Sequence, residues 1–228
     1  MAECYMCEKE GTTVEHVPPK CVFPEKKDLP EGWNLRSQLI TVPACDEHNT
    51  KKSKYDEYIL YVLVMNLPAN EVGGNHFQTK LIRAIERNPN LIKQFLSTHQ
   101  RVTIQDTETG EWQNTIAIEI DRHRFDGAID MMSRALHYEH FSEKWLGKVS
   151  IQPDFLLSLD PETARDTNEP IEQLAKAADQ IFENQPYFGE NKEVFKYQVI
   201  NGNDQCEKIM RLSFYSNCKV TVFFGLNG

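Results

Sequence analysis

The sequence predicts an α+β protein in which a small N-terminal module precedes a larger domain of helices and antiparallel strands. Three observations lead to this prediction. Residues 1–50 are punctuated by prolines and lack apolar periodicity, as expected of a small module that cannot build a core of its own. Several segments between residues 53 and 145 carry apolar residues at helical spacing. Residues 194–204 and 208–225 have the composition and turns of antiparallel strands, so we divide the chain into residues 1–66 and 67–228.

The first helices and the first hairpin follow from local patterns. A helix is predicted from Ser53 until Pro68 stops it. After a polar loop at residues 70–75, residues 75–99 read as one helix, or as two helices broken near Asn88–Pro89. Residues 101–120 alternate around a turn at 107–111 and predict a β-hairpin. Four side chains of this segment are expected to face the core: Trp112, Ile116, Ile118 and Ile120.

The remaining elements complete the larger domain. Residues 121–145 place large apolar side chains at helical spacing: Phe125, Ile129, Met132, Leu136 and Phe141. A short strand is expected within 148–159 and a helix within 168–184. The C-terminal segments predict two or three antiparallel strands, with turns at Asn201–Gly202 and Ser216–Asn217.

Composition restricts the class of protein. The 228 residues are 40% hydrophobic and 26% charged, which are values of a folded globular protein. No apolar run approaches the roughly 18 residues of a membrane span, and the N-terminus has no apolar signal core, so we expect a cytoplasmic protein without membrane contact. The net charge of -9 argues against a protein that binds nucleic acid with its whole surface. Any such contact is expected to be local, for example at the basic run of Lys51, Lys52 and Lys54.

Two pairs of metal-ligand residues bracket the proline-rich segment. Cys4-x-x-Cys7 and Cys45-x-x-His48 together offer three thiolates and one imidazole, a typical set for a structural zinc ion. Four protein ligands fill the coordination shell, so the zinc is expected to serve the fold and not the chemistry. We expect Cys206 and Cys218 in the core and Cys21 as a buried thiol, with Cys21 as the alternative to Cys4.

The segments "CYMC", "EHVPPKC" and "QLITVPACDEHNTKK", taken in this order, resemble the HNH endonucleases. The resemblance covers about residues 4–58. It implies a small zinc-stapled ββα-metal module, followed here by a mixed helix and antiparallel-sheet domain that has no motif of its own. The implied activity is metal-dependent hydrolysis of phosphodiester bonds, so the chemistry would lie at Glu15–His16 between the two Cys pairs.

Residue roles follow from the same resemblance. His16 takes the position of the general base, and a neutral imidazole suits this task at cellular pH. Glu15 and Asn49 take the positions that hold one catalytic Mg²⁺ or Mn²⁺ through oxygen ligands. The residue that orients the base falls on Gln38, with Asn34 as the alternative. Lys51 or Lys52 would contact a substrate phosphate.

The sequence therefore predicts an HNH-type endonuclease that cuts DNA, with residues 67–228 binding a protein partner. A partner of the kind expected is an ATPase in a bacterial defence system against phage. Two alternatives stay open. One is a zinc-stabilised adaptor that binds nucleic acid or protein through a degenerate HNH centre, and the other is a toxin that cleaves RNA.

Overall fold

We describe the protein from a computed structural model that covers residues 2–50, 53–66, 69–105, 109–160 and 162–225. The N-terminal part begins with an antiparallel pair, β1 (Thr13–His16) and β2 (Thr41–Ala44), in which Glu15 lies opposite Val42. The segment between these strands has two short 3-10 turns, η1 (Lys20–Val22) and η2 (Lys26–Asp28). Two helices follow β2, namely α1 (Asp46–Thr50) and α2 (Ser53–Val64).

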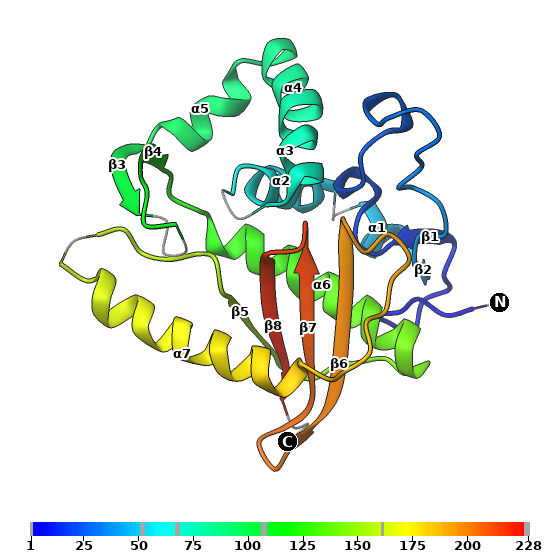
Figure 1. Ribbon diagram of the computed structural model, residues 1–228. Helices are drawn as coiled ribbons and strands as arrows, with labels where there is room; N and C mark the ends of the chain where they lie inside the picture. Colours follow the sequence, from blue (N-terminus) through cyan, green and yellow to red (C-terminus); the bar gives the residue numbers. More distant parts are fainter. Residues whose placement is uncertain (1, 51–52, 67–68, 106–108, 161, 226–228) are drawn as a thin grey trace.

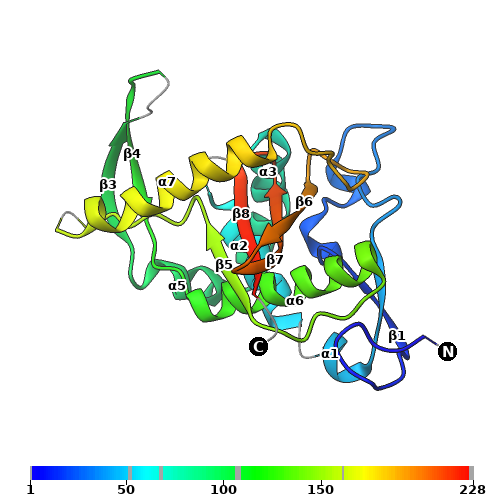
Figure 2. The same cartoon turned by 90° about the horizontal axis from the view of Figure 1, so that it is seen from below.

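A helical arch and a hairpin come next (Figure 1). The arch contains α3 (Glu71–His76), a π-turn η3 (Phe77–Leu81), α4 (Ile82–Arg87) and α5 (Asn90–Leu96). The hairpin pairs β3 (Gln100–Gln105) with β4 (Trp112–Ala117). Figure 2 shows that this hairpin extends away from the rest of the molecule.

The C-terminal part is a sheet between two long helices. The sheet is four-stranded and antiparallel, in the order β5-β8-β7-β6. Its strands are β5 (Val149–Pro153), β6 (Phe195–Asn203), β7 (Cys206–Phe214) and β8 (Cys218–Gly225). Figure 2 shows α7 (Ala164–Phe182) on one face of this sheet and α6 (Arg122–Phe141) on the other.

Alternation along the strands gives this sheet two different faces. Met210 and Leu212 of β7 are fully buried, and Val220 lies opposite Leu212 on β8. Arg211, which lies between Met210 and Leu212 in β7, belongs to the other face, because successive strand side chains point to opposite sides. On that face Arg211 donates to Asp179 of α7 at 2.8 Å. The sheet is therefore apolar on one face and carries an ionic network beneath α7 on the other.

The helix α2 joins the two predicted parts. Residues 58–64 are all buried, so α2 is covered on every side and not along one stripe. Tyr58 Oη accepts a hydrogen bond of 2.7 Å from the backbone N–H of Asp121, the N-cap residue of α6. One continuous hydrophobic core includes Val42, Leu63 and Met210. The N-terminal part therefore packs directly on the larger one.

Most predicted helices and strands are confirmed, including the break at Asn88–Pro89 and the partly buried Ile118 and Ile120. Three details are wrong. The hairpin turns Trp112 and Ile116 outward, with exposed fractions of 67% and 49%. The expected loop at 70–75 is the helix α3, and the hairpin expected to turn at residues 201–202 turns at 204–205.

The start of α3 explains the error at residues 70–75. Asn70 caps the helix by accepting a hydrogen bond of 3.0 Å from the backbone N–H of Gly73. A Cβ added at Gly73 would lie 3.0 Å from Cγ of Tyr215, so glycine here permits close packing of the helix on the turn before β8. Among the described residues, no helix is both long and apolar enough to span a bilayer.

Candidate functional site

The two paired motifs come together in one cluster. The ligand atoms of four residues all lie within 4.8 Å of one another: Cys4, Cys7, Cys45 and His48. Cys7 Sγ is 3.8 Å from Cys45 Sγ, and His48 Nδ1 is 3.3 Å from Cys45 Sγ. A tetrahedral zinc with ordinary bond lengths needs about 3.8 Å between two sulfurs and about 3.6 Å between sulfur and nitrogen. This cluster could therefore hold a metal ion such as zinc.

Local backbone bonds build the two halves of this cluster. The backbone N–H of Cys4 donates to the carbonyl of Lys9 at 2.9 Å, closing a tight loop around Cys7. The next residue, Tyr5, donates its N–H to the carbonyl of Pro43 in β2, also at 2.9 Å. In the second half, the N–H of His48 donates to the carbonyl of Cys45 at 3.0 Å in the first turn of α1. The first pair thus lies in a tight loop, and the second pair spans one turn of backbone at the start of α1.

The electrostatics of the cluster favour a bound cation. Burial disfavours the charged form of Cys4, but N–H groups of Met6 and Cys45 hydrogen-bond the sulfur and lower its pKa to about 6. Burial, together with the neighbouring sulfurs of Cys4 and Cys45, raises the pKa of Cys7. The thiolate is the form that binds metal, and a divalent cation would relieve the repulsion between crowded sulfurs.

A cleft of about 400 Å³ lies beside this cluster, and Glu15, His16 and Asn49 all border it. Glu15 is 4% exposed, whereas His16 and Asn49 are half-buried. The structure therefore brings three of the predicted catalytic residues to one place. They come from two elements, since Glu15 and His16 end β1 and Asn49 lies in α1.

Strand geometry and one hydrogen bond explain this arrangement. Thr13 and Glu15 share one face of β1, because alternate residues of a strand point to the same side. Asn49 Nδ2 donates to Thr13 Oγ1 at 3.0 Å, which fixes the Asn49 amide over that face. His16 is the last residue of β1, and its backbone pairs with Thr41. His48, one of the four residues that could hold a metal ion, directly precedes Asn49 in α1.

The sequence prediction missed other residues of the cleft. Asp56 and Glu57 border it from α2, and Cys21 donates its thiol hydrogen to the carbonyl of Asp56 at 3.3 Å. Lys20 of η1 and Lys80 of η3 also border it. The helical pattern from Ser53 could have indicated Asp56, since it follows the motif within one or two turns. Nothing in the sequence connects Lys80 to the motif.

Other predicted site residues lie elsewhere. Gln38 does not border the cleft; it is exposed, has a φ of 52°, and lies near Gly189 and Asn191 instead. Asn34 is also exposed, and its Oδ1 accepts a hydrogen bond from the backbone N–H of Arg36 at 3.1 Å. The structure therefore supplies neither residue as the partner that orients His16. The predicted phosphate contacts, Lys51 and Lys52, lie outside the described residues.

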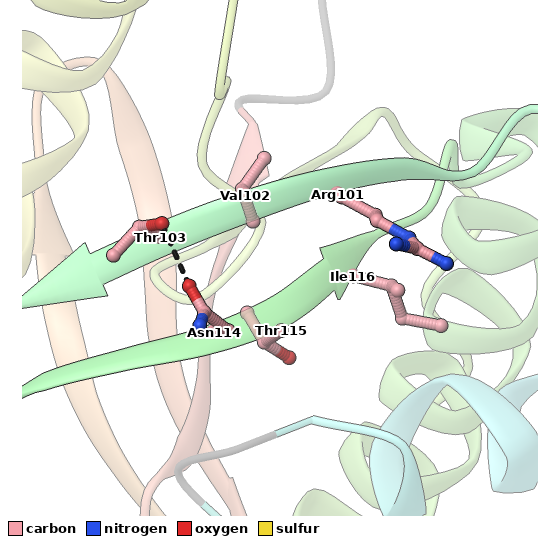
Figure 3. Close-up of a pocket in the computed structure, with 6 residues that line it drawn as sticks. All are labelled: Arg101, Val102, Thr103, Asn114, Thr115 and Ile116. Carbon is pink, nitrogen blue, oxygen red and sulfur yellow. Dashed lines mark hydrogen bonds between the residues drawn. The ribbon is translucent and has the colours of Figure 1, made fainter.

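A second hollow of about 620 Å³ lies along the projecting hairpin and is bordered by Arg101, Val102, Thr103, Asn114, Thr115 and Ile116 (Figure 3). Arg101 and Ile116 are register partners and lie side by side in Figure 3. Thr103 Oγ1 donates to Asn114 Oδ1 at 2.9 Å. This hollow contains none of the predicted site residues, so the cleft at Glu15 is the better candidate for chemistry.

Comparison of the chain with protein families, with curated proteins and with solved structures found no match.

Proposed function

We propose that this protein is a metal-dependent endonuclease of the HNH type that hydrolyses DNA. The observation that carries the proposal is the convergence of Glu15, His16 and Asn49 on one cleft next to the Cys and His cluster. The local order of elements supports it, because an antiparallel strand pair precedes a helix, as in a ββα-metal module. His16 and Asn49 are partly exposed in this cleft, so a substrate could reach them from solvent.

Each residue has a role in this proposal. His16, half-buried at the end of β1, accepts the proton of the water whose oxygen attacks the phosphorus atom. The phosphodiester P–O bond on the opposite side then breaks, and the leaving oxygen is protonated by solvent. Because His16 lines the cleft, a water bound there could donate its proton to the ring.

The donor atoms fit a hard divalent cation such as Mg²⁺ or Mn²⁺. Glu15 offers carboxylate oxygens, and Asn49 offers its amide oxygen because its Nδ2 is engaged with Thr13. A cation held by so few protein groups keeps several waters, which is usual for Mg²⁺. Such an ion, when bound, neutralises charge that develops on the phosphate and the leaving oxygen. Many HNH endonucleases have aspartate at the position of Glu15, and the longer glutamate side chain still presents carboxylate oxygens.

We propose that Cys4, Cys7, Cys45 and His48 hold a structural zinc ion. Its four ligands leave no open position for a substrate or a reactive water. Elemental analysis of the purified protein should find about one zinc per chain, and strong chelation should unfold the N-terminal part. A protein that is well folded without any metal would contradict this assignment.

The acidic chain is expected to rely on local contacts and on a partner for targeting. The net charge of -9 disfavours general affinity for DNA, so a protein that binds residues 67–228, such as an ATPase, would deliver the nuclease. Antiviral defence is a setting in which such a pair would act. The corresponding test is phage infection of cells that carry both proteins or only one of them, with protection expected only when both are present.

A non-catalytic adaptor is the second candidate, favoured by the position of Gln38 outside the cleft. Plasmid DNA and single-stranded RNA, each incubated with Mg²⁺ or Mn²⁺, separate the candidates. Nicking or linearisation of the plasmid supports the DNA nuclease, and cleavage of RNA alone supports the toxin. If wild-type protein with stoichiometric zinc cleaves neither substrate, with or without its partner, the adaptor is correct and the enzyme proposal fails.

A further inference from the structure

The charge of the cleft raises a problem for an anionic substrate. Besides Glu15, which would hold the divalent cation, Asp56 and Glu57 border the cleft, and carboxylates repel a phosphodiester. The cations on its border are Lys20 and Lys80 among the residues that the structure describes. Lys20 is exposed, whereas the side chain of Lys80 is 25% exposed and forms part of the wall. Lys80 is thus the better placed of the two to offset the carboxylates inside the cleft.

A π-turn places Lys80 at this wall. Over Phe77–Leu81 the helix widens, and the backbone N–H of Ile82 reaches the carbonyl of Phe77, five residues earlier. Such a turn contains one extra residue, and π-turns inside helices are frequent at functional sites. His76 before the turn and Leu81 at its end are both 1% exposed, so both flanks are fixed in the core. Deletion of one residue from this turn would rotate the helical residues before it relative to those after it by about 100°.

Lys80 keeps hydrogen-bonding capacity for a ligand. Its Nζ lies 3.7 Å from Glu25 Oε1, which is beyond the usual range of a hydrogen bond. Glu25 has a nearer partner in Lys27, whose Nζ lies 2.7 Å from Glu25 Oε2. Within the described part of the chain, the Lys80 ammonium has this long ion pair with Glu25 and no hydrogen bond. Its three donors can therefore turn toward a phosphate in the cleft.

We propose that Lys80 is a substrate-positioning residue whose ammonium binds a phosphate of the nucleic-acid strand next to the bond presented to His16. This inference rests on the proposed nuclease function. Lysine binds phosphate as a compact charge, and such contacts fix the register of a strand without reading its sequence. Because Lys80 lies outside residues 1–66, the N-terminal module alone would have an incomplete site.

The test measures DNA binding separately from cleavage. A His16→Ala background prevents cleavage, and a fluorescently labelled DNA duplex is titrated in Mg²⁺ at several salt concentrations. Adding Lys80→Gln is expected to weaken binding about tenfold at low salt. It should also reduce the slope of log Kd against log salt by about 0.9, because one phosphate contact is lost. Adding Lys80→Arg should restore most of the affinity, since the charge remains.

Lys93→Gln is the matched control, because Lys93 is an exposed residue of α5 that does not border the cleft. If Lys80→Gln and Lys93→Gln leave the same affinity and the same salt slope, Lys80 has no role in positioning. The slope of log Kd against log salt distinguishes a lost phosphate contact from misfolding, since it does not depend on the fraction of folded protein. Failure of the nuclease proposal itself looks different, because the wild-type protein would then cleave no DNA, whatever the effect of Lys80→Gln on binding.

Discussion

Acidification should destabilise the protein through one buried histidine, His76. Its side chain is 1% exposed at the end of α3, and its Nδ1 lies 2.9 Å from Tyr215 Oη. Tyr215 Oη donates its hydrogen to the carbonyl of Val22 at 2.5 Å, so His76 must carry a hydrogen on Nδ1 and donate it. The other ring nitrogen, Nε2, has no hydrogen-bond partner among the described residues. A proton added at Nε2 would therefore be buried without an acceptor.

The size of the effect follows from the pKa of this group. Burial, helped by the charges of Lys80 and Arg36 and opposed by Asp28 and Glu25, lowers the pKa of His76 from 6.5 to about 4. Protonation thus favours the unfolded chain. The part of the free energy of unfolding that depends on neutral His76 is fully present above about pH 6.5 and is lost as the pH drops toward 4. The full loss is about 3 kcal/mol, of which about 2 kcal/mol is lost between about pH 7.5 and about pH 5.

The assay is urea unfolding at several pH values between these limits, with the same zinc concentration throughout. Other groups also titrate, so the informative quantity is the difference between wild type and His76→Gln. The variant should lose about 2 kcal/mol less on acidification than wild type. His123→Gln, which changes an exposed histidine of α6, should behave as wild type. Equal pH dependence of wild type and His76→Gln, or a measured His76 pKa near 6.5, would refute the reasoning.

Two further predictions concern packing and charge in the core. Gly73→Ala should destabilise the fold by about 1–3 kcal/mol, because the new Cβ would lie 3.0 Å from Cγ of Tyr215. In Gly74→Ala the new Cβ meets nothing within 4 Å, so this variant should instead stabilise the helix by up to about 1 kcal/mol. Equal free energies of unfolding in urea for the two variants would contradict this packing. Arg211→Met should cost about 3–5 kcal/mol, because Arg211 is 2% exposed and its loss leaves Asp154 mostly buried without its cation. The double variant with Asp154→Leu should recover part of that loss in the same assay, and no recovery would mean that burial of the Asp154 charge is not the cause.

Local patterns predicted most of the elements, because helix periodicity, a proline break and strand alternation depend only on residues that are close together in the sequence. The errors arose where distant contacts decide the outcome. The segment at 70–75 contains two glycines and reads as a loop, yet Asn70 caps a helix there and Gly73 packs against Tyr215. Trp112 and Ile116 read as core residues, but their hairpin extends away from the molecule and no sheet covers it.

In the candidate site, too, local patterns were predictable and distant contacts were not. The cluster of Cys4, Cys7, Cys45 and His48 was predictable, since the members of each pair are close in the sequence and two pairs complete one ligand set. The place of Lys80 was not, because it depends on a π-turn and on how this turn packs against α2.

Gln38 failed for a related reason. Its expected role assumed a position in the cleft, whereas Gln38, with a φ of 52°, lies near Gly189 and Asn191 and does not border the cleft. A resemblance in sequence order does not fix where a loop residue lies in space.

The rate of DNA cleavage by His16→Ala tests the central claim most directly. Wild type, His16→Ala and His123→Ala are compared under single-turnover conditions with Mn²⁺, after zinc content and folding are shown to be equal. Loss of a general base should slow cleavage by about 10²–10⁴-fold in His16→Ala and leave His123→Ala unchanged. Equal cleavage rates in all three proteins would show that the cleft at Glu15, His16 and Asn49 is not where phosphodiesters are hydrolysed.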